Sequence, residues 1–178
     1  ALAEVARIQT AERGLERLLE ELREFAAPMK LDKNLHSLQS AWRSAWKDVT
    51  ASNNRDIHFD EIVGDVDLNC HIDEFRIGQV FRNLFENSVA ACGENPSIHV
   101  HCENGDGTLK VIVRDNGPGL DAEQRENVFQ PFFTTKSKGT GLGMAIVKRI
   151  IDAHGGEIRV GDSEQGAEFR MVLPLGSP

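Results

Sequence analysis

The stretch PFFTTKSKGTGLGMAIV, residues 131–147, has the composition of a loop that binds phosphate. Its glycines alternate just before an apolar run that predicts a helix: Gly139, Gly141 and Gly143. Two lysines, Lys136 and Lys138, precede them. Glycines let the backbone amides at the start of a helix approach an anion. The spacing fits neither the dinucleotide fingerprint nor the common Gly-Lys phosphate loop, so it indicates another kind of anion loop or an ordinary glycine turn.

The composition of the whole chain describes a folded, soluble protein. Of 178 residues, 40% are hydrophobic and 27% are charged, and no apolar run reaches the roughly 20 residues that cross a bilayer. Three scattered cysteines and the lack of a signal pattern favour the cytoplasm. The net charge of −8 argues against nucleic acid as a partner. Any phosphate ligand would therefore depend on local groups or on a metal ion.

The chain divides into a helical lead-in, residues 1–50, and a mixed α and β region, residues 51–178. The lead-in has apolar residues at alternating spacings of three and four: Ile8, Ala11, Leu15, Leu18, Leu22 and Phe25. This seam predicts either a dimerising helical stalk or one amphipathic helix packed on its own domain. A second helical pattern contains Leu35, Leu38, Trp42, Trp46 and Val49.

The region 51–178 alternates strand and helix patterns. Strands are predicted around residues 57–59 and 66–70, at 97–102 and 109–115, and at 157–160 and 167–175. Helices are predicted after Asp73, a plausible N-cap, and at 143–154, where Gly155 and Gly156 end the helix. The predicted class is α+β: a two-layer sandwich in which helices cover one face of a mixed sheet, preceded by a helical stalk.

Asp115 ends a predicted strand, and Gly117 and Gly119 follow at once in RDNGPGL, residues 114–120. A carboxylate fixed at a strand end can accept a hydrogen bond from an exocyclic amine, while glycines leave room for a flat ring. The alternative is an ordinary Asp-Asn-Gly turn.

Asn83 and Asn87 lie four residues apart on one face of the predicted helix, beside large apolar residues. Amides that face a core are costly unless they bind something. Side-chain carbonyl oxygens suit Mg²⁺, which usually arrives with a nucleotide. The alternative is a pair of surface asparagines bonded to local backbone.

Four segments occur in series: QVFRNLFEN (79–87), DNGPGL (115–120), FQPFF (129–133) and GTGLGMAIV (139–147). Together they resemble the N, G1, F and G2 boxes of sensor histidine kinases. Residues 131–147 most resemble the nitrogen-regulation group of these kinases, and the resemblance implies that they form a lid over the triphosphate of ATP. The resemblance covers residues 57–175. It implies the ATP-binding α/β sandwich shared with gyrase, mismatch-repair and heat-shock-chaperone ATPases, with ATP and Mg²⁺ as ligands.

The resemblance also implies a role for each residue that matches a motif. Asp115 would recognise the adenine amine, with Gly117 and Gly119 shaping its pocket. Asn87, helped by Asn83, would hold Mg²⁺ against the phosphates. The lid and phosphate site would be formed by Lys136, Thr140, Gly141, Leu142 and Gly143.

Two positions depart from the family pattern. Ala90 stands where many members have a phosphate-binding lysine, so Lys136 or Arg82 is expected to compensate. Ala167 replaces a frequent threonine near the adenine, which removes a hydroxyl but not the site.

The helices before residue 50 resemble the end of a kinase dimerisation region, without the helix that carries its phosphate-accepting histidine. HIDEFR, residues 71–76, mimics that histidine motif but is expected at the start of the Asn-bearing helix, with His71 on the surface. A metal site at His99, His101 and Cys102 is disfavoured, because strand alternation turns the histidines outward and the cysteine inward. Glu86 is expected to be an exposed helix residue rather than a base.

The resemblance implies the catalytic region of a two-component sensor histidine kinase. It would position Mg-ATP for transfer of the γ-phosphoryl group to a histidine of the dimerisation domain, and onward to the receiver domain of a response regulator, with a homodimer expected for the full-length protein. An ATP hydrolase of the same fold is one alternative, and a non-catalytic nucleotide-binding relay is another. The signal, the regulator, and transfer within or between protomers are not encoded in these motifs.

Overall fold

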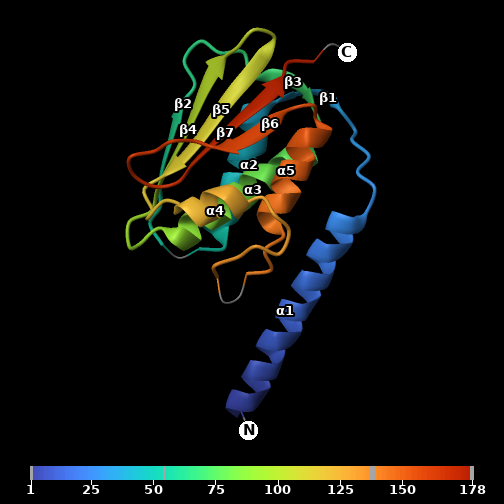
Figure 1. Ribbon diagram of the computed structural model, residues 1–178, viewed down its shortest axis with the longest axis vertical. Coiled ribbons are helices and arrows are strands. Elements are labelled where there is room, and N and C mark those ends of the chain that lie inside the picture. The colour runs from blue at the N-terminus through green and yellow to red at the C-terminus, as the bar shows by residue number, and fades with distance from the viewer. Residues whose placement is uncertain (1, 54, 137–138, 177–178) are drawn as a thin grey trace.

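A computed structural model describes residues 2–53, 55–136 and 139–176 (Figure 1). Lys138 lies outside these described residues. The helices are α1 (Leu2–Ala26), α2 (Leu38–Ala51), α3 (Glu74–Ala91), α4 (Ala122–Asn127) and α5 (Gly143–Ala153). The strands are β1 (Asn34–Ser37), β2 (His58–Ile62), β3 (Asn69–Ile72), β4 (Ser97–Asn104), β5 (Thr108–Asp115), β6 (Glu157–Val160) and β7 (Glu168–Pro174). In the described part of the chain, no helix is long and apolar enough to cross a membrane.

The main sheet has five strands in the order β2-β4-β5-β7-β6. β2 pairs with β4 in parallel, whereas the other three pairs are antiparallel, so the sheet is mixed. Residues on β4 and β5 alternate between buried and more exposed positions, which places one face of the sheet against the helical layer. The two-layer sandwich and its mixed sheet are therefore confirmed (Figure 1).

The strand alternation also settles the histidines of β4. Cys102 is buried in the core, while His99 and His101 are half-buried on the other face of the sheet. Among the residues that the structure describes, no group of three or more metal-ligating side chains is placed to hold an ion.

Helix α3 is the centre of the helical layer. The side chain of Asp73 accepts a hydrogen bond from the backbone N–H of Arg76, which confirms Asp73 as the N-cap. One face of α3 is fully buried: Ile77, Val80, Phe81, Leu84 and Phe85. The opposite edge of the same helix is left to carry the asparagines.

Helix α2 belongs to the same core as α3. Trp42 is fully buried and packs edge-on against Phe81, with ring centroids 5.6 Å apart. Its indole N–H donates to Glu61 on β2, and Arg43 pairs with the same carboxylate at 2.6 Å. The expected boundary at residue 50 would separate α2 from the core in which it is packed. We therefore propose that the catalytic domain begins near residue 34.

Two element boundaries differ from the sequence pattern. Leu35 was expected in the second helix but lies on β1, which pairs antiparallel with β3 and leaves Leu35 exposed. The strand expected over 66–70 instead forms at Asn69–Ile72. Both shifts come from the pairing of β1 with β3, because a two-stranded ladder between segments over 30 residues apart leaves no local periodic signal.

The apolar seam of α1 is mostly uncovered. Ile8, Leu15 and Leu22 are exposed, with exposed fractions of 67%, 58% and 40%, whereas Leu18 and Phe25 pack against the domain core. Figure 1 shows the N-terminal half of α1 extending away from the body. Of the α1 side chains that the structure describes, those packed against the domain core therefore lie in the C-terminal part of the helix.

His154 joins the end of α5 to the start of α3. It is buried; its Nε2 accepts from the backbone N–H of Asp73 at 3.1 Å, and its Nδ1 lies 2.8 Å from the carbonyl oxygen of Ile150. This geometry requires a neutral ring that donates from Nδ1. Burial lowers the pKa of His154 below its ordinary value of 6.5.

Stability should fall as the pH drops below about 6.5 because of His154. The pKa of His154 is lower in the folded chain than in the unfolded chain. As the pH falls, the unfolded chain therefore binds a proton first, which stabilises it relative to the folded chain. The slope from this one proton is at most about 1.4 kcal/mol per pH unit. We expect His154→Gln to be less stable at pH 8 but to show a shallower loss between pH 8 and 5.5 in urea titrations. An equal slope in His154→Gln and the parent would contradict the assignment.

Candidate nucleotide-binding site

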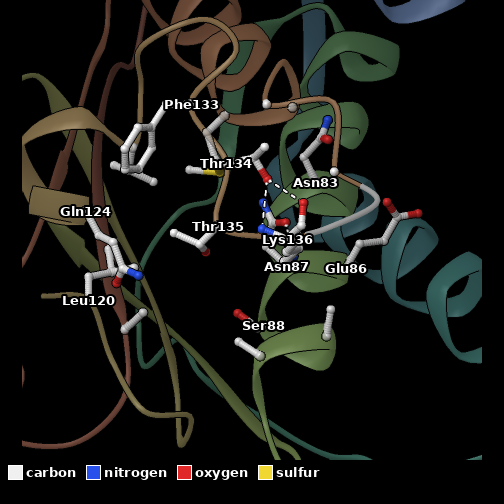
Figure 2. Close-up of a pocket in the computed structure, with 18 of the residues that line it drawn as sticks. Asn83, Glu86, Asn87, Ser88, Leu120, Gln124, Phe133, Thr134, Thr135 and Lys136 are labelled. Carbon is white, nitrogen blue, oxygen red and sulfur yellow. Dashed lines mark hydrogen bonds between the residues drawn. The ribbon is translucent and has the colours of Figure 1, made fainter. Parts of the chain in front are cut away.

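One cavity of about 680 Å³ lies between α3, the segment 133–143 and the sheet ends of β5 and β7. This volume lies within the range of about 300–1,000 Å³ typical of small-molecule sites. Figure 2 shows residues of α3, among them Asn83 and Asn87, facing Thr134 and Lys136 of the lid segment. The cavity thus gathers residues from motifs more than 50 positions apart.

Asp115 forms the buried end of the cavity. Only 4% of the residue is exposed. Its Oδ1 accepts from the backbone N–H groups of Gly117 at 2.9 Å and Ala167 at 3.0 Å, and its Oδ2 accepts from the hydroxyl of Ser88 at 2.8 Å. A carboxylate offers about four acceptor positions, so Oδ2 retains one for a donor in the cavity.

The asparagines also line the cavity, as the spacing predicts. Asn87 Oδ1 accepts a hydrogen bond from Lys136 Nζ at 2.8 Å (Figure 2). Asn83 Nδ2 donates to the backbone carbonyl of Gln79, which leaves its Oδ1 facing Gly143. Arg82, the other candidate to replace the missing lysine at position 90, lines a groove between α2 and α3 instead. Lys136 is therefore the cation that reaches the predicted metal oxygen.

Two glycines are required by the geometry of the lid. Gly141 has a φ of +71°, and a Cβ there would lie 2.4 Å from the carbonyl carbon of Phe132. A Cβ on Gly143 would lie 2.8 Å from Asn83 Oδ1. Because α5 begins at Gly143, this contact brings the helix N-terminus against the asparagines.

The remaining expected residues are divided between the cavity and its supports. Thr140, Gly119 and Ala167 line the cavity. Leu142 is fully buried in the hydrophobic core and does not line the cavity. Gly117 donates its backbone N–H to the carboxylate of Asp115. Leu142 and Gly117 therefore support the residues that line the cavity.

The sequence motifs do not predict Ser88 and Glu21, two polar residues that line the cavity. Ser88 follows Asn87 directly and fixes Asp115; its 3% exposure marks a buried hydroxyl, but a serine in a helix carries no distinctive signal. Glu21 of α1 lines the cavity and accepts from the hydroxyl of Thr140. Only the packing of α1 on α5 brings Glu21 there. Glu86 is exposed, as expected, at the cavity edge (Figure 2).

His71 differs from its prediction as a surface residue at the start of a helix. It lies on β3 and is half-buried, and its Nδ1 is buried with no hydrogen-bond partner among the described residues. The cause is the pairing of β3 with β1, which extends the strand up to the N-cap of α3.

Comparison with known proteins identifies the family. Residues 72–177, more than half of the chain, match the family described as histidine kinase-, DNA gyrase B-, and HSP90-like ATPase. The chain belongs to this family. The match to an ATPase family confirms the expectation, drawn from the series of boxes, that this domain binds a nucleotide.

The relatives are sensor histidine kinases. The chain is 36% identical over 170 residues to sensor histidine kinase ZraS of Escherichia coli O157:H7, which covers 90% of this chain and 36% of that protein. Histidine kinase ThkA, in complex with response regulator protein TrrA, superposes with a TM-score of 0.79 at 31% identity over 99% of this chain and 52% of that chain. Full-length ShkA in complex with AMPPNP gives 0.82 at 26% identity over 97% of this chain and 38% of that chain. The predicted resemblance to sensor histidine kinases is confirmed, and the chain spans little more than a third of the length of ZraS.

The residues fit a nucleotide and its metal. Asp115 offers one acceptor position at the buried end of the cavity. Asn87 Oδ1 already contacts a positive charge, because it accepts a hydrogen bond from the ammonium group of Lys136. Amide oxygens are ligands that Mg²⁺ accepts, and the start of α5 provides amides for phosphate.

Proposed function

We propose that this chain is the part of a sensor histidine kinase that binds Mg-ATP and presents its γ-phosphoryl group to a histidine of the dimerisation domain. From there the phosphoryl group would pass to the receiver domain of a response regulator. One observation carries the proposal: a single cavity is lined by a buried acceptor, Asp115, and by the Asn87–Lys136 pair. These groups suit a ligand that carries both a donor amine and charged phosphates.

The chain's own residues would orient the nucleotide. Asp115 would accept from the adenine amine through Oδ2, while Ser88 and the two backbone N–H groups keep the carboxylate in place. The amides of Gly141 to Gly143 and Lys136 would hold the phosphates. Asn87, with Asn83 beside it, would hold Mg²⁺, whose charge offsets that of the phosphates when it is bound. Positioning and charge neutralisation account for most of phosphoryl-transfer catalysis.

Hydrolysis is the weaker alternative. ATP hydrolases of this fold place a water-activating glutamate four residues before the metal asparagine. That position is Asn83, whose amide cannot take a proton from water, and its Nδ2 is bonded to Gln79. Glu86 is an exposed helix residue at the cavity edge, three positions after Asn83 and not at the position of the catalytic glutamate. A relay without catalysis is disfavoured because Asn87, Asp115 and the glycines of the motifs are all present.

The partners follow from the relatives and from α1. ThkA is found in complex with a response regulator, which supports a receiver domain as the partner of this chain. The exposed apolar residues Ile8, Leu15 and Leu22 form one stripe on α1, which supports a homodimer through this helix in the full-length protein.

The test uses the full-length protein with γ-labelled ATP. Label on histidine is lost in acid and kept in base, and it should then move to a response regulator. Phosphate released without labelled protein would support the hydrolase instead. Nucleotide binding without either product would support the relay.

The lid offers a separate prediction. Residues 134–142 are mostly polar or glycine and have little apolar surface to anchor them. A triphosphate adds contacts with Gly141 to Gly143 and Lys136, whereas adenosine reaches only the Asp115 end. Backbone amides of 134–142 should become protected from hydrogen exchange with Mg²⁺ and a non-hydrolysable ATP analogue, but not with adenosine. Equal protection without ligand, with adenosine and with the analogue would mean a lid that is already formed.

A further inference from the structure

Among the α1 side chains that the structure describes, that of Glu21 reaches the nucleotide cavity. Glu21 is half-buried, lines the cavity, and accepts a hydrogen bond from the hydroxyl of Thr140. Thr140 directly precedes the glycines that lead into α5, and its Oγ1 also lies 3.4 Å from the backbone nitrogen of Leu142. The hydroxyl of Thr140 in the lid thus donates its hydrogen bond to a carboxylate from outside the catalytic domain.

The same helix is fastened at its C-terminal end by α5. The guanidinium of Arg149 donates to the carbonyl oxygens of Phe25 and, at 2.5 Å, of Ala27. It also lies 5.7 Å from the centroid of the Phe25 ring. The last carbonyls of a helix have no partner within the helix, so an arginine there both satisfies them and complements the helix dipole.

These two contacts lie about one turn apart on α1, at Glu21 and at Phe25. α5 runs from Gly143, beside the lid, to Ala153, and its face toward the core is buried. Helix α1 is therefore held against α5 by Arg149 and against the lid by Glu21. Loss of either contact should weaken the other, because both require the same placement of α1.

The chemistry of the contact resembles that of the expected ligand. A carboxylate is an anion with oxygen acceptors, and it stands where the hydroxyl of Thr140 and the start of α5 attract phosphate oxygens. Two anions cannot share these donors without repulsion.

We propose that Glu21 acts as a phosphate mimic that competes with the triphosphate for the lid, so that docking of α1 and binding of ATP oppose each other. This rests on the proposed nucleotide function of the cavity. The coupling is reciprocal: a movement of α1 away from the lid raises the affinity for ATP, and ATP weakens the docking of α1. Adenosine has no phosphate and is indifferent to Glu21.

The test measures binding of Mg-ATP and of adenosine by calorimetry in four single variants. Glu21→Ala should bind ATP roughly three- to tenfold more tightly, the factor expected for a partly exposed charge-assisted hydrogen bond. Its control, Glu20→Ala, removes the same charge from an exposed neighbour on α1 and should leave ATP affinity unchanged. Arg149→Ala should reproduce the gain, while Lys148→Ala, which breaks only a pair with Asp152 on α5, should not. Adenosine affinity should be the same in all.

The double variant Glu21→Ala, Arg149→Ala tests the shared mechanism. It should gain no more than either single variant, because both substitutions release the same helix. ATP affinity that stays unchanged or falls in both Glu21→Ala and Arg149→Ala overturns the inference, and so does an equal gain in Glu20→Ala. A parent that binds no ATP overturns the proposed function itself. If Glu21→Ala does not fold, Arg149→Ala against Lys148→Ala decides by the same criterion.

Discussion

Asp115→Asn should weaken ATP binding by roughly 1.5–3 kcal/mol, about 10- to 150-fold, with the fold intact. Oδ1 of Asp115 accepts from two backbone N–H groups, those of Gly117 and Ala167. An asparagine would keep its oxygen on these donors, which places its NH₂ group where Oδ2 now lies. The hydroxyl of Ser88 can turn to accept from that NH₂. The adenine amine cannot, so a donor would face a donor.

Calorimetry on the folded variant measures this effect directly. The matched control is Asp106→Asn in the exposed turn between β4 and β5, which makes the same chemical change away from the cavity and should bind like the parent. A thermal melt should show that Asp115→Asn remains folded. Affinity close to the parental value in a folded Asp115→Asn variant would remove Asp115 from the adenine site.

Asn87→Ala should abolish most of the dependence of ATP binding on Mg²⁺. Loss of even an outer partner of a bound metal typically costs about 10- to 100-fold in metal affinity, and loss of a direct ligand should cost at least as much. Adenosine binding should persist, because the Asp115 end of the cavity does not involve Asn87. Lys136 would also lose its contact with Oδ1 of this residue.

The measurement is the ratio of ATP affinities with and without Mg²⁺. Asn104→Ala, at the exposed end of β4, is the control and should keep the parental ratio. The same ratio in Asn87→Ala and the parent would refute the metal role. A ratio near one, together with lost adenosine binding, would instead point to damage of the whole cavity.

Much of the site could be predicted because its residues stand in short ordered motifs. Asn83 and Asn87 share a helix face by their spacing of four, and both line the cavity. Asp115 was predicted from its place at a strand end, where the next glycines leave room for a ligand. Leu142 shows the limit of a motif, because its position in the box says nothing about which way its side chain points; it is fully buried in the core.

The unpredicted parts depend on contacts between distant segments. β1 forms only because Asn34–Ser37 finds Asn69–Ile72, so the second helix starts at Leu38 rather than at Leu35. Ser88 is an ordinary helix residue until the end of β5 places Asp115 beside it. The same β1–β3 pairing places His71 on a strand, where it is half-buried rather than exposed.

The sequence by itself determined the two-layer class, the family, and the asparagines and Asp115 of the cavity, because periodicity and short motifs are local properties of the chain. Only the tertiary structure decided where α1 lies. Its seam of apolar residues favours a stalk but is also compatible with a packed helix, and the packing of its C-terminal part depends on partners supplied by α5 and the lid. The contacts of Glu21 with Thr140 and of Arg149 with Phe25 join residues more than 110 positions apart. No local pattern records such pairs, since each side chain also suits a solvated helix surface.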